Sequence, residues 1–321
     1  MASPLKIAIL DDYQDAVRHL PSFGLLDGLD VKVFNHSARG LGQLAIRLAP
    51  FDVLVLIRER TRIDRALLAR LPNLKMICQT GRVGAHLDVA AACERGIQVV
   101  DGPGDPVATA ELTWALVLAG SRHLLQYSAL LRQGLWQASS IHPEKSRLGR
   151  AVHGRTLGIW GYGRIGQRVA RYAQAFGMHV MVWGSDDGRA RARGDGLTVA
   201  DSRADFFARA DVLTLHLRLS DSTRHLITAE DLALMKPDAL LVNTSRAELL
   251  APDALEAALK AGRPGAAAID VFETEPLPPT ASLLQLENLI ATPHLGYVEQ
   301  DSYEIYFRPL FEAIAGYAQA S

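Results

Sequence analysis

The sequence predicts an α/β protein with two domains, each a parallel sheet with helices on both faces, and a cleft between them. Two observations predict this class. Short apolar runs typical of buried parallel strands alternate with helical patterns through most of the chain. The length of 321 residues is also large for one compact core, which favours two domains.

The first hundred residues follow this alternation closely. We expect helices at 41–48, 64–71 and 89–95, with Asp64 as an N-cap. The predicted strands lie at 5–10, 31–34, 53–57, 74–78 and 97–100. The turn-rich segment 101–106 then marks a boundary.

Beyond this boundary the sequence predicts one long apolar helix at 107–131 and a loop at 137–155. Later helices are expected at 229–235 and 252–261, and strands at 212–217, 240–243, 266–270 and 289–292. The sequence after Gly296 is helical again, with Asp301 and Glu304 spaced as a capping-box variant and Pro309 expected to kink it. Its apolar face needs a partner, so we expect it to return to the first domain. The predicted domains are therefore 1–102 with 298–321, for substrate and catalysis, and 103–297.

The glycine-rich turn Gly161-Tyr162-Gly163-Arg164-Ile165-Gly166 identifies what the second domain binds. It lies between an apolar run at 157–160 and helical sequence to 176, and a second apolar run follows at 180–183. Gly161 permits the tight turn, Gly163 lets the backbone approach a pyrophosphate, and Gly166 lets the helix pack on the strand. The N–H groups at the start of that helix, at Arg164 and Ile165, would face the phosphates. The second domain, 103–297, is thus a predicted dinucleotide-binding Rossmann domain, and both domains are Rossmann-like.

Composition excludes several other classes. The formal net charge is −1, so nucleic acid and an anionic membrane are not expected partners. We predict no signal peptide or membrane span, which favours a cytoplasmic location. Cys78 and Cys93 lack metal-ligand spacing and read as buried free thiols, so no metal site is predicted.

Polar residues follow three of the predicted strands in the second half. They form the segments Asn243-Thr244-Ser245-Arg246, Asp270 to Pro276, and Thr292-Pro293-His294-Leu295-Gly296. Because the carboxyl ends of parallel strands form the ligand crevice, all three should open toward the cleft that holds the cofactor. A cation, carboxylates and an imidazole would then converge there.

The sequence resembles the D-isomer-specific 2-hydroxyacid dehydrogenase family. Within that family it resembles the phosphoglycerate dehydrogenase-like and glyoxylate-hydroxypyruvate reductase-like members. The matching stretches are LGIWGYGRIG, NTSRAE, AAIDVFETEP and ATPHLGY, with ERT, LPNLKMI, TGRVGAHLD and VATAELTWALVLA upstream. The resemblance spans almost the whole chain. It implies NAD(P)-dependent hydride transfer between a nicotinamide and the C2 of a small D-2-hydroxy acid or 2-keto acid.

The resemblance also assigns catalytic roles. Arg246 would hold the substrate carboxylate and polarise the keto oxygen, because guanidinium offers a planar donor fork. His294 would be the general acid–base, and Glu275 would orient it. Glu273 is a rival carboxylate, but Glu275 precedes Pro276 as the family's pattern requires.

Substrate and cofactor contacts follow in the same way. The backbone N–H groups of Val83 and Gly84, in the loop with Arg82, could meet the substrate carboxylate. Asp270 matches a position near the nicotinamide amide, although a strand-end cap remains open. Further cofactor contacts are assigned to His216, Leu217, Thr244 and Gly296.

The adenosine end leaves NAD and NADP both open. The acid that usually binds the ribose hydroxyls is expected near Gly184, where this chain has Gly184-Ser185-Asp186. Ser185 with Arg189 or Arg191 could bind a 2′-phosphate, which favours NADP slightly. Asp186 could instead take the place of the missing acid and restore the usual preference for NAD. The arginines could also simply form a solvated loop.

Three further readings follow from the same resemblance. A catalytically inert, NAD(H)-sensing binding protein of the corepressor kind is the alternative function, although Arg246, Glu275 and His294 are all present. Formate or phosphite oxidation is disfavoured, because formate enzymes of this family use Gln where Glu275 stands. The helix at 107–131 is more apolar than a surface helix needs to be, and we expect it to form the interface of a homodimer.

Overall fold

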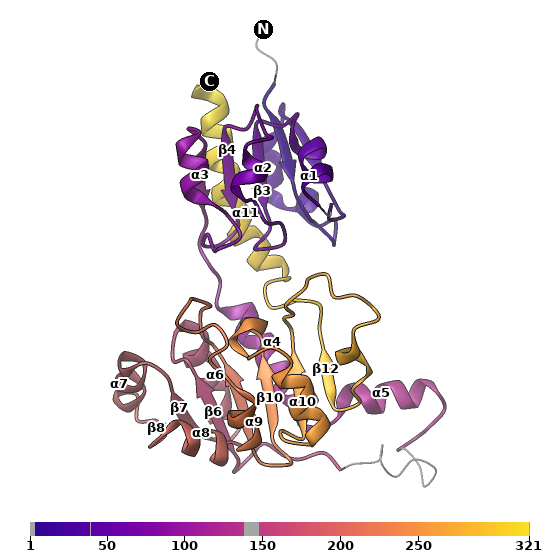
Figure 1. Cartoon of the computed structure of the whole chain (residues 1–321), viewed down its shortest axis with the longest axis vertical. Coiled ribbons are helices and arrows are strands. Elements are labelled where there is room, and N and C mark those ends of the chain that lie inside the picture. Colours follow the sequence, from indigo (N-terminus) through magenta and orange to yellow (C-terminus); the bar gives the residue numbers. More distant parts are fainter. Residues whose placement is uncertain (1–3, 39, 138–147, 321) are drawn as a thin grey trace. The chain divides into compact units, whose positions relative to one another are not determined.

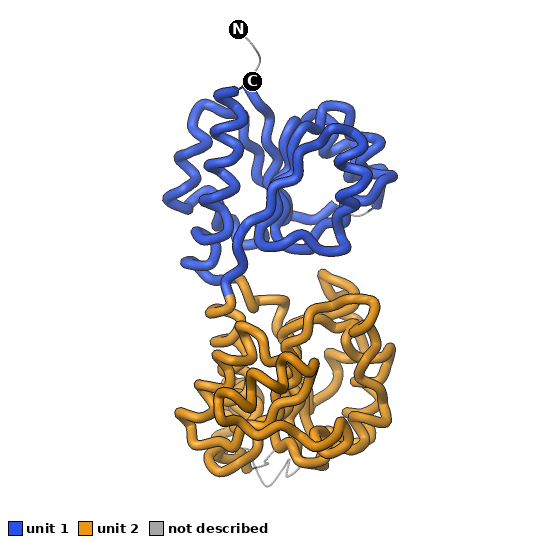
Figure 2. Tube along the Cα trace, turned by 90° about the vertical axis from the view of Figure 1, so that its left-hand side faces the viewer, with its two compact units in different colours: residues 1–105, 298–321 blue, residues 106–297 orange. Residues whose placement is uncertain are grey.

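The computed structural model describes residues 4–38, 40–137 and 148–320. The chain divides into two compact units, which Figure 2 colours separately. Unit 1 comprises Met1–Asp105 with Val298–Ser321, and unit 2 comprises Pro106–Tyr297. Part of the loop predicted at 137–155 lies outside the described residues.

Unit 1 is built on a five-stranded parallel sheet with the order β2-β1-β3-β4-β5. Its strands are β1 (Lys6–Ile9), β2 (Asp30–Val33), β3 (Val53–Leu56), β4 (Met76–Gln79) and β5 (Gln98–Asp101). Its helices are α1 (Leu41–Leu48), α2 (Arg65–Leu68) and α3 (Val89–Glu94), with the short 3-10 helices η1 (Val17–His19) and η2 (Pro21–Leu26). As predicted, Asp64 caps α2, because its side chain accepts the N–H of Leu67.

The last helix, α11 (Gln300–Ala320), belongs to unit 1 and packs against η2. Phe311 meets Phe23 edge to face, with 6.1 Å between ring centroids. The predicted capping pair is wrong, because Glu304 instead accepts a hydrogen bond from the Ser22 hydroxyl. Glu299 caps the helix, since its carboxylate accepts the N–H groups of Asp301 and Ser302.

Unit 2 is built on a seven-stranded parallel sheet with the order β12-β11-β10-β9-β6-β7-β8 (Figure 1). Its strands are β6 (Thr156–Trp160), β7 (His179–Trp183), β8 (Thr198–Val199), β9 (Val212–Leu215), β10 (Leu240–Asn243), β11 (Ala266–Ile269) and β12 (Leu289–Ala291). Its helices are α4 (Val107–Ser121), α5 (Leu124–Arg132), α6 (Arg164–Ala175), α7 (Asp186–Gly194), α8 (Arg203–Arg209), α9 (Ala229–Ala233) and α10 (Ala254–Ala261).

Successive residues of β6 enter different apolar clusters, which shows that both faces of this sheet are covered. Ile159 packs in the cluster with α4 and α6, whereas Trp160 packs with Phe206 and Phe207 of α8. The predicted α/β class with two parallel, helix-covered sheets is therefore confirmed.

One local prediction in unit 2 was wrong, and one alternative that the sequence left open is decided. The single helix predicted at 107–131 is broken into α4 and α5, because His123 between them has a left-handed backbone with φ of 51°. Arg189 and Arg191, for which a solvated loop was an open alternative, lie on helix α7. Ser185 starts this helix, since its hydroxyl accepts the N–H of Gly188.

The cysteine prediction is half correct. Cys78 is buried, and burial raises the pKa of its thiol to about 12, whereas Cys93 is exposed. Within the described part of the chain, no helix is both long enough and apolar enough to cross a membrane.

Candidate active site

The glycine turn links β6 to α6 and is closely packed on one side. Gly161 has φ of 101°, and a Cβ there would lie 2.6 Å from the backbone oxygen of His216. A Cβ at Gly166 would overlap the backbone oxygen of Gly161. Only glycine can therefore occupy these two positions without moving the backbone.

Gly163 differs, because a Cβ there would meet nothing within 4 Å. Gly163 is the N-cap of α6 and provides no side-chain hydrogen bond to it. The first turn of α6, which begins at Arg164 and Ile165, therefore starts beside open space, and the start of a helix attracts anions. This arrangement fits the pyrophosphate of a dinucleotide.

His216 and Leu217 follow β9 and lie against the glycine turn. The Nε2 atom of His216 is buried and has no hydrogen-bond partner within the described ranges. Burial lowers the pKa of His216 to about 3, so its imidazole is neutral. A buried polar atom without a partner is consistent with a site that a ligand completes.

The adenosine end of the predicted site lies where β7 meets α7. Gly184 has φ of 147°, and Ser185 caps the helix. The Asp186 side chain is 94% exposed and pairs with Arg189. The guanidinium of Arg189 also lies over the Trp183 ring, 4.7 Å from its centroid. Charges of both signs are therefore present at the predicted adenosine end of the site.

His294 and Glu275 are in direct contact. The Nδ1 atom of His294 lies 2.7 Å from Oε2 of Glu275, and both side chains are partly buried. The other carboxylate oxygen of Glu275 accepts the N–H of Phe272, at 2.9 Å. Both oxygens of Glu275 are thus used, which fixes the carboxylate and, through it, the imidazole ring.

Asp270 holds the turn that carries His294. Its carboxylate accepts hydrogen bonds from the Thr292 hydroxyl and from the N–H groups of Leu295 and Gly296, at 2.6, 2.7 and 2.8 Å. The residue is fully buried, and burial raises the pKa of its carboxyl against the opposing effect of these bonds. His294 itself has a left-handed φ of 54°, so the turn needs such an anchor. This is the capping role that the sequence left open, and a contact with nicotinamide stays a prediction.

The loop with Arg246 is fixed by its own polar residues. The Asn243 side chain donates to the backbone oxygen of Arg246 and accepts the N–H of Ser245. The Ser245 hydroxyl donates to the backbone oxygen of Leu217, which ties this loop to the end of β9. The Nη1 atom of Arg246 donates to the backbone oxygen of Ser245, at 2.6 Å.

Two threonines of α4 support the site and were not singled out from the sequence. The Thr113 hydroxyl lies 2.7 Å from that of Thr244, and the Thr109 hydroxyl donates to the backbone oxygen of Gly296, also at 2.7 Å. Their spacing of four residues places both on one face of α4. The sequence does show this spacing, but the spacing indicates no role until the loops that carry Thr244 and Gly296 are located.

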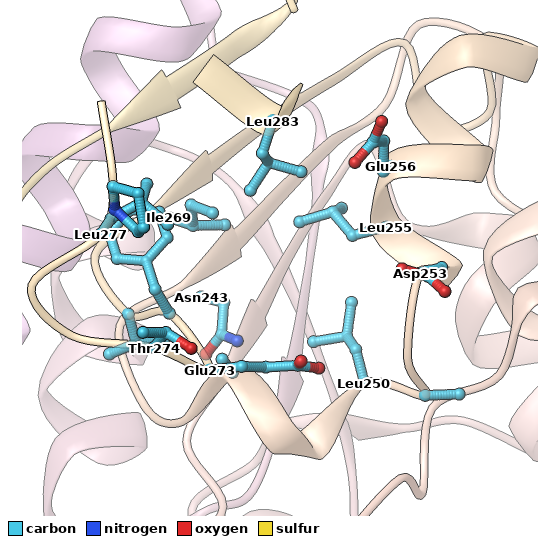
Figure 3. Close-up of a pocket in the computed structure, with 15 residues that line it drawn as sticks. Asn243, Leu250, Asp253, Leu255, Glu256, Ile269, Glu273, Thr274, Leu277 and Leu283 are labelled. Carbon is cyan, nitrogen blue, oxygen red and sulfur yellow. The ribbon is translucent and has the colours of Figure 1, made fainter. Parts of the chain in front are cut away.

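A cavity of about 300 Å³ is lined in part by residues of the loop that carries Glu275. Figure 3 shows Leu250, Leu255 and Leu283 in its wall, with Glu273 along one side. The rival carboxylate Glu273 therefore lines this cavity, whereas Glu275 contacts His294.

The three predicted substrate residues of unit 1 lie in the loop after β4. The Arg82 guanidinium pairs with Asp101, with 3.2 Å between Nη1 and Oδ1. The N–H of Val83 makes a long bond of 3.5 Å to the other oxygen of Asp101. A Cβ at Gly84 would lie 3.0 Å from a carboxylate oxygen of Glu59.

Known proteins resemble the chain over most of its length. The sequence model of the D-isomer specific 2-hydroxyacid dehydrogenase, NAD binding domain, matches residues 114–296. A glyoxylate reductase of Aeropyrum pernix is 41% identical over 75% of this chain and 72% of its own. A D-3-phosphoglycerate dehydrogenase of Methanocaldococcus jannaschii is 38% identical over 91% of this chain and 53% of its own, so the chain spans about half of that relative. A crystal structure of a phosphoglycerate oxidoreductase from Vibrio cholerae O395 has a TM-score of 0.94 and 52% identity, and covers 99% of this chain and 100% of that one.

These likenesses, with the glycine turn and the His294–Glu275 pair, define the class of protein: an oxidoreductase that binds a nicotinamide cofactor. More narrowly, the chain belongs to the D-isomer-specific 2-hydroxyacid dehydrogenase family. The resemblance stated from sequence motifs is thereby confirmed.

Proposed function

We propose that this chain transfers a hydride between a nicotinamide cofactor and the C2 of a small D-2-hydroxy acid or 2-keto acid. The observation that carries the proposal is the 2.7 Å contact between His294 and Glu275, on a turn anchored by the buried Asp270. Glu275 fixes the imidazole ring, and Asp270 holds the turn that carries it. A ring held in this way is suited to give or take a proton at one defined place.

The roles of the catalytic groups follow from these contacts. Because Nδ1 of His294 faces Glu275, the proton transferred to or from the substrate oxygen is the one on Nε2. The cofactor, when bound, donates or accepts the hydride. Arg246 binds the substrate carboxylate and the keto oxygen, and its positive charge favours the negative charge that develops there. Val83 and Gly84 supply backbone N–H groups to the same carboxylate, in the loop with Arg82.

For the cofactor we propose that NADP is accepted, with NAD as the competing candidate. The support is local. No carboxylate stands at Gly184, Ser185 opens α7 beside it, and Arg189 is stacked on Trp183. The assigned contacts at Asp186, Thr244, Asp270 and Gly296 belong to the same proposal.

A homodimer and a cytoplasmic location stay predictions. In support of the former, Leu124, Leu125 and Leu131 are exposed on α5, directly after the apolar helix α4. A molar mass of one chain in light scattering at micromolar concentration would count against the homodimer.

The proposed function is tested by a panel of 2-keto acids with NADH and NADPH side by side, followed by absorbance of the cofactor. We expect turnover of at least one acid, and a loss of about a hundredfold in kcat/KM in Arg246→Ala, because about 3 kcal/mol of charge-assisted binding is removed. Arg224→Ala, an exposed arginine of unit 2, is the matched control and should change kcat/KM by less than about twofold.

Two results would contradict the proposal. Undiminished turnover in Arg246→Ala would remove Arg246 from the site. A protein that binds cofactor but turns over no acid on the panel would instead support the inert, NAD(H)-sensing alternative.

A further inference from the structure

Helix α7 carries residues proposed for the adenosine end of the cofactor, yet little apolar contact holds it. Only two of its nine residues are buried, Gly188 and Ala192. Both side chains are small, so the apolar area that they remove from water is small as well. Other contacts must therefore help to keep α7 in place.

Tyr162, the second residue of the glycine turn, lies against this helix. Its side chain is buried, with 5% of the residue exposed. A Cβ on Gly188 would lie 3.9 Å from the Cβ and from the backbone nitrogen of Tyr162. Ala192 is fully buried in the same apolar cluster as Tyr162. The glycine turn thus packs on α7 through the one large side chain between its first two glycines.

Polar contacts join the same two elements. The hydroxyl of Tyr162 donates to Oδ2 of Asp195, at 2.7 Å, and Asp195 is the C-cap residue of α7. Burial, together with this bond, raises the pKa of Tyr162 to about 12, so the hydroxyl keeps its proton at neutral pH. An acid is disfavoured at the carboxyl end of a helix, and the bond to Tyr162 offsets part of that cost.

The start of α7 is tied to the same point. The Ser185 hydroxyl accepts the N–H of Gly188, the residue that lies against Tyr162. The backbone on both sides of Tyr162 belongs to the turn proposed to hold the pyrophosphate. A ligand that spans two subsites binds more tightly when both are already held in place before it arrives.

We propose that Tyr162, through its bond to Asp195, is a positioning residue that fixes α7 relative to the glycine turn. The pyrophosphate and adenosine halves of the cofactor would then meet one preorganised site. The inference rests on the proposed function and adds to it a role for the Tyr162 side chain that needs no contact with the cofactor.

The test measures binding to the full chain by calorimetry, so it needs no turnover. ADP-ribose spans both halves of the proposed site, whereas adenosine reaches only the α7 side; each is used with its 2′-phosphate if NADPH is the preferred cofactor. Tyr162→Phe should raise the Kd of ADP-ribose about fivefold, the effect of one lost hydrogen bond, and that of adenosine less than about twofold. Tyr172→Phe removes a tyrosine hydroxyl of α6 that makes no hydrogen bond within the described ranges, and should change neither.

Variants of Asp195 test the partner. Asp195→Ala should repeat the loss seen in Tyr162→Phe, whereas Asp195→Asn keeps an oxygen acceptor and should restore most of the binding. The double variant Tyr162→Phe with Asp195→Ala should lose no more than either single variant, because both remove the same bond. In steady-state kinetics each loss should fall on the KM for the cofactor, with kcat and the KM for the keto acid unchanged.

Three results would overturn the inference while the proposed function stands. These are an unchanged Kd of ADP-ribose in Tyr162→Phe, equal losses for ADP-ribose and adenosine, and losses that add in the double variant. Failure of the wild type to bind ADP-ribose in either form would instead overturn the proposed cofactor site, and the inference with it.

Discussion

The two ends of the unit 2 sheet differ in how their polar groups are held. At the β11 and β12 end, Asp270 is fully buried, and both it and Glu275 have partners on both oxygens. At the β7 end, the Asp186 side chain is 94% exposed, and its pair with Arg189 joins residues three apart on one helix. The first end is a fixed network, and the second is a set of adaptable surface charges.

Under the proposed function, the first end would carry the proton transfer and the second end the choice of cofactor. A proton transfer needs one donor atom in one place, and a hydrogen-bonded network anchored by a buried carboxylate provides that. The choice between two cofactors needs only a small difference in binding free energy, which exposed charges can supply. We therefore expect large effects from changes at the first end and small, cofactor-specific effects from changes at the second.

The largest effect is expected at His294. His294→Gln should lower kcat about a thousandfold, because it removes the group that carries the proton. Glu275→Gln should lower kcat about thirtyfold, since the ring loses its fixed orientation. Steady-state kinetics of the two variants and of the double variant form a cycle that tests whether Glu275 acts through His294.

In that cycle the double variant should be no slower than His294→Gln alone. Independent roles would instead make the two losses multiply. Losses that multiply would contradict the assignment of Glu275 as the residue that positions His294.

Asp270→Asn should have the next largest effect, this time on stability. The amide has one oxygen where the carboxylate offers two, so a buried N–H group of the His294 turn loses its acceptor. We expect a loss of about 2 kcal/mol in the free energy of unfolding, measured by urea denaturation. Asp253→Asn, which removes an exposed carboxylate without a cap bond at the start of α10, is the control and should cost less than about 0.5 kcal/mol. Equal losses in both variants would mean that Asp270 anchors nothing.

The smallest effect is expected at Arg189. Arg189→Ala should raise the KM for NADPH about fivefold and that for NADH less than about twofold, because one partly exposed charge contributes about 1 kcal/mol. Arg193→Ala, an exposed arginine of the same helix, should change neither. Equal changes for both cofactors would show that Arg189 does not face a 2′-phosphate, and would favour NAD.

The sequence predicted the first end of the sheet well for a physical reason. Short apolar strands followed by polar residues imply a shared edge, and the three loops at 243–246, 270–276 and 292–296 all follow neighbouring strands. The Glu275–His294 contact could be expected because the resemblance to the family implies it, through the DVFETEP and TPH stretches that carry the two residues. Thr109 and Thr113 could not be singled out, since their value depends on tertiary contacts that helical spacing does not reveal.

Other features were hidden because they rest on single residues or long-range contacts. Nothing in the apolar pattern at 107–131 announces that His123 takes a left-handed backbone and ends α4. For the segment 186–194 a solvated loop is one alternative from the sequence, because its arginines and glycine obscure Ser185 as the N-cap of a helix. The pairing of Arg82 with Asp101 joins residues nineteen apart through the β4–β5 register, which composition cannot give.

The central claim is that this chain moves a hydride to C2 of a keto acid. It is tested most directly with a reduced cofactor that carries deuterium at both positions of the nicotinamide C4, and with the keto acid found most active on the panel. The account predicts that mass spectrometry will find one deuterium at C2 of the hydroxy acid formed. A hydroxy acid without deuterium, or no hydroxy acid at all, would contradict it.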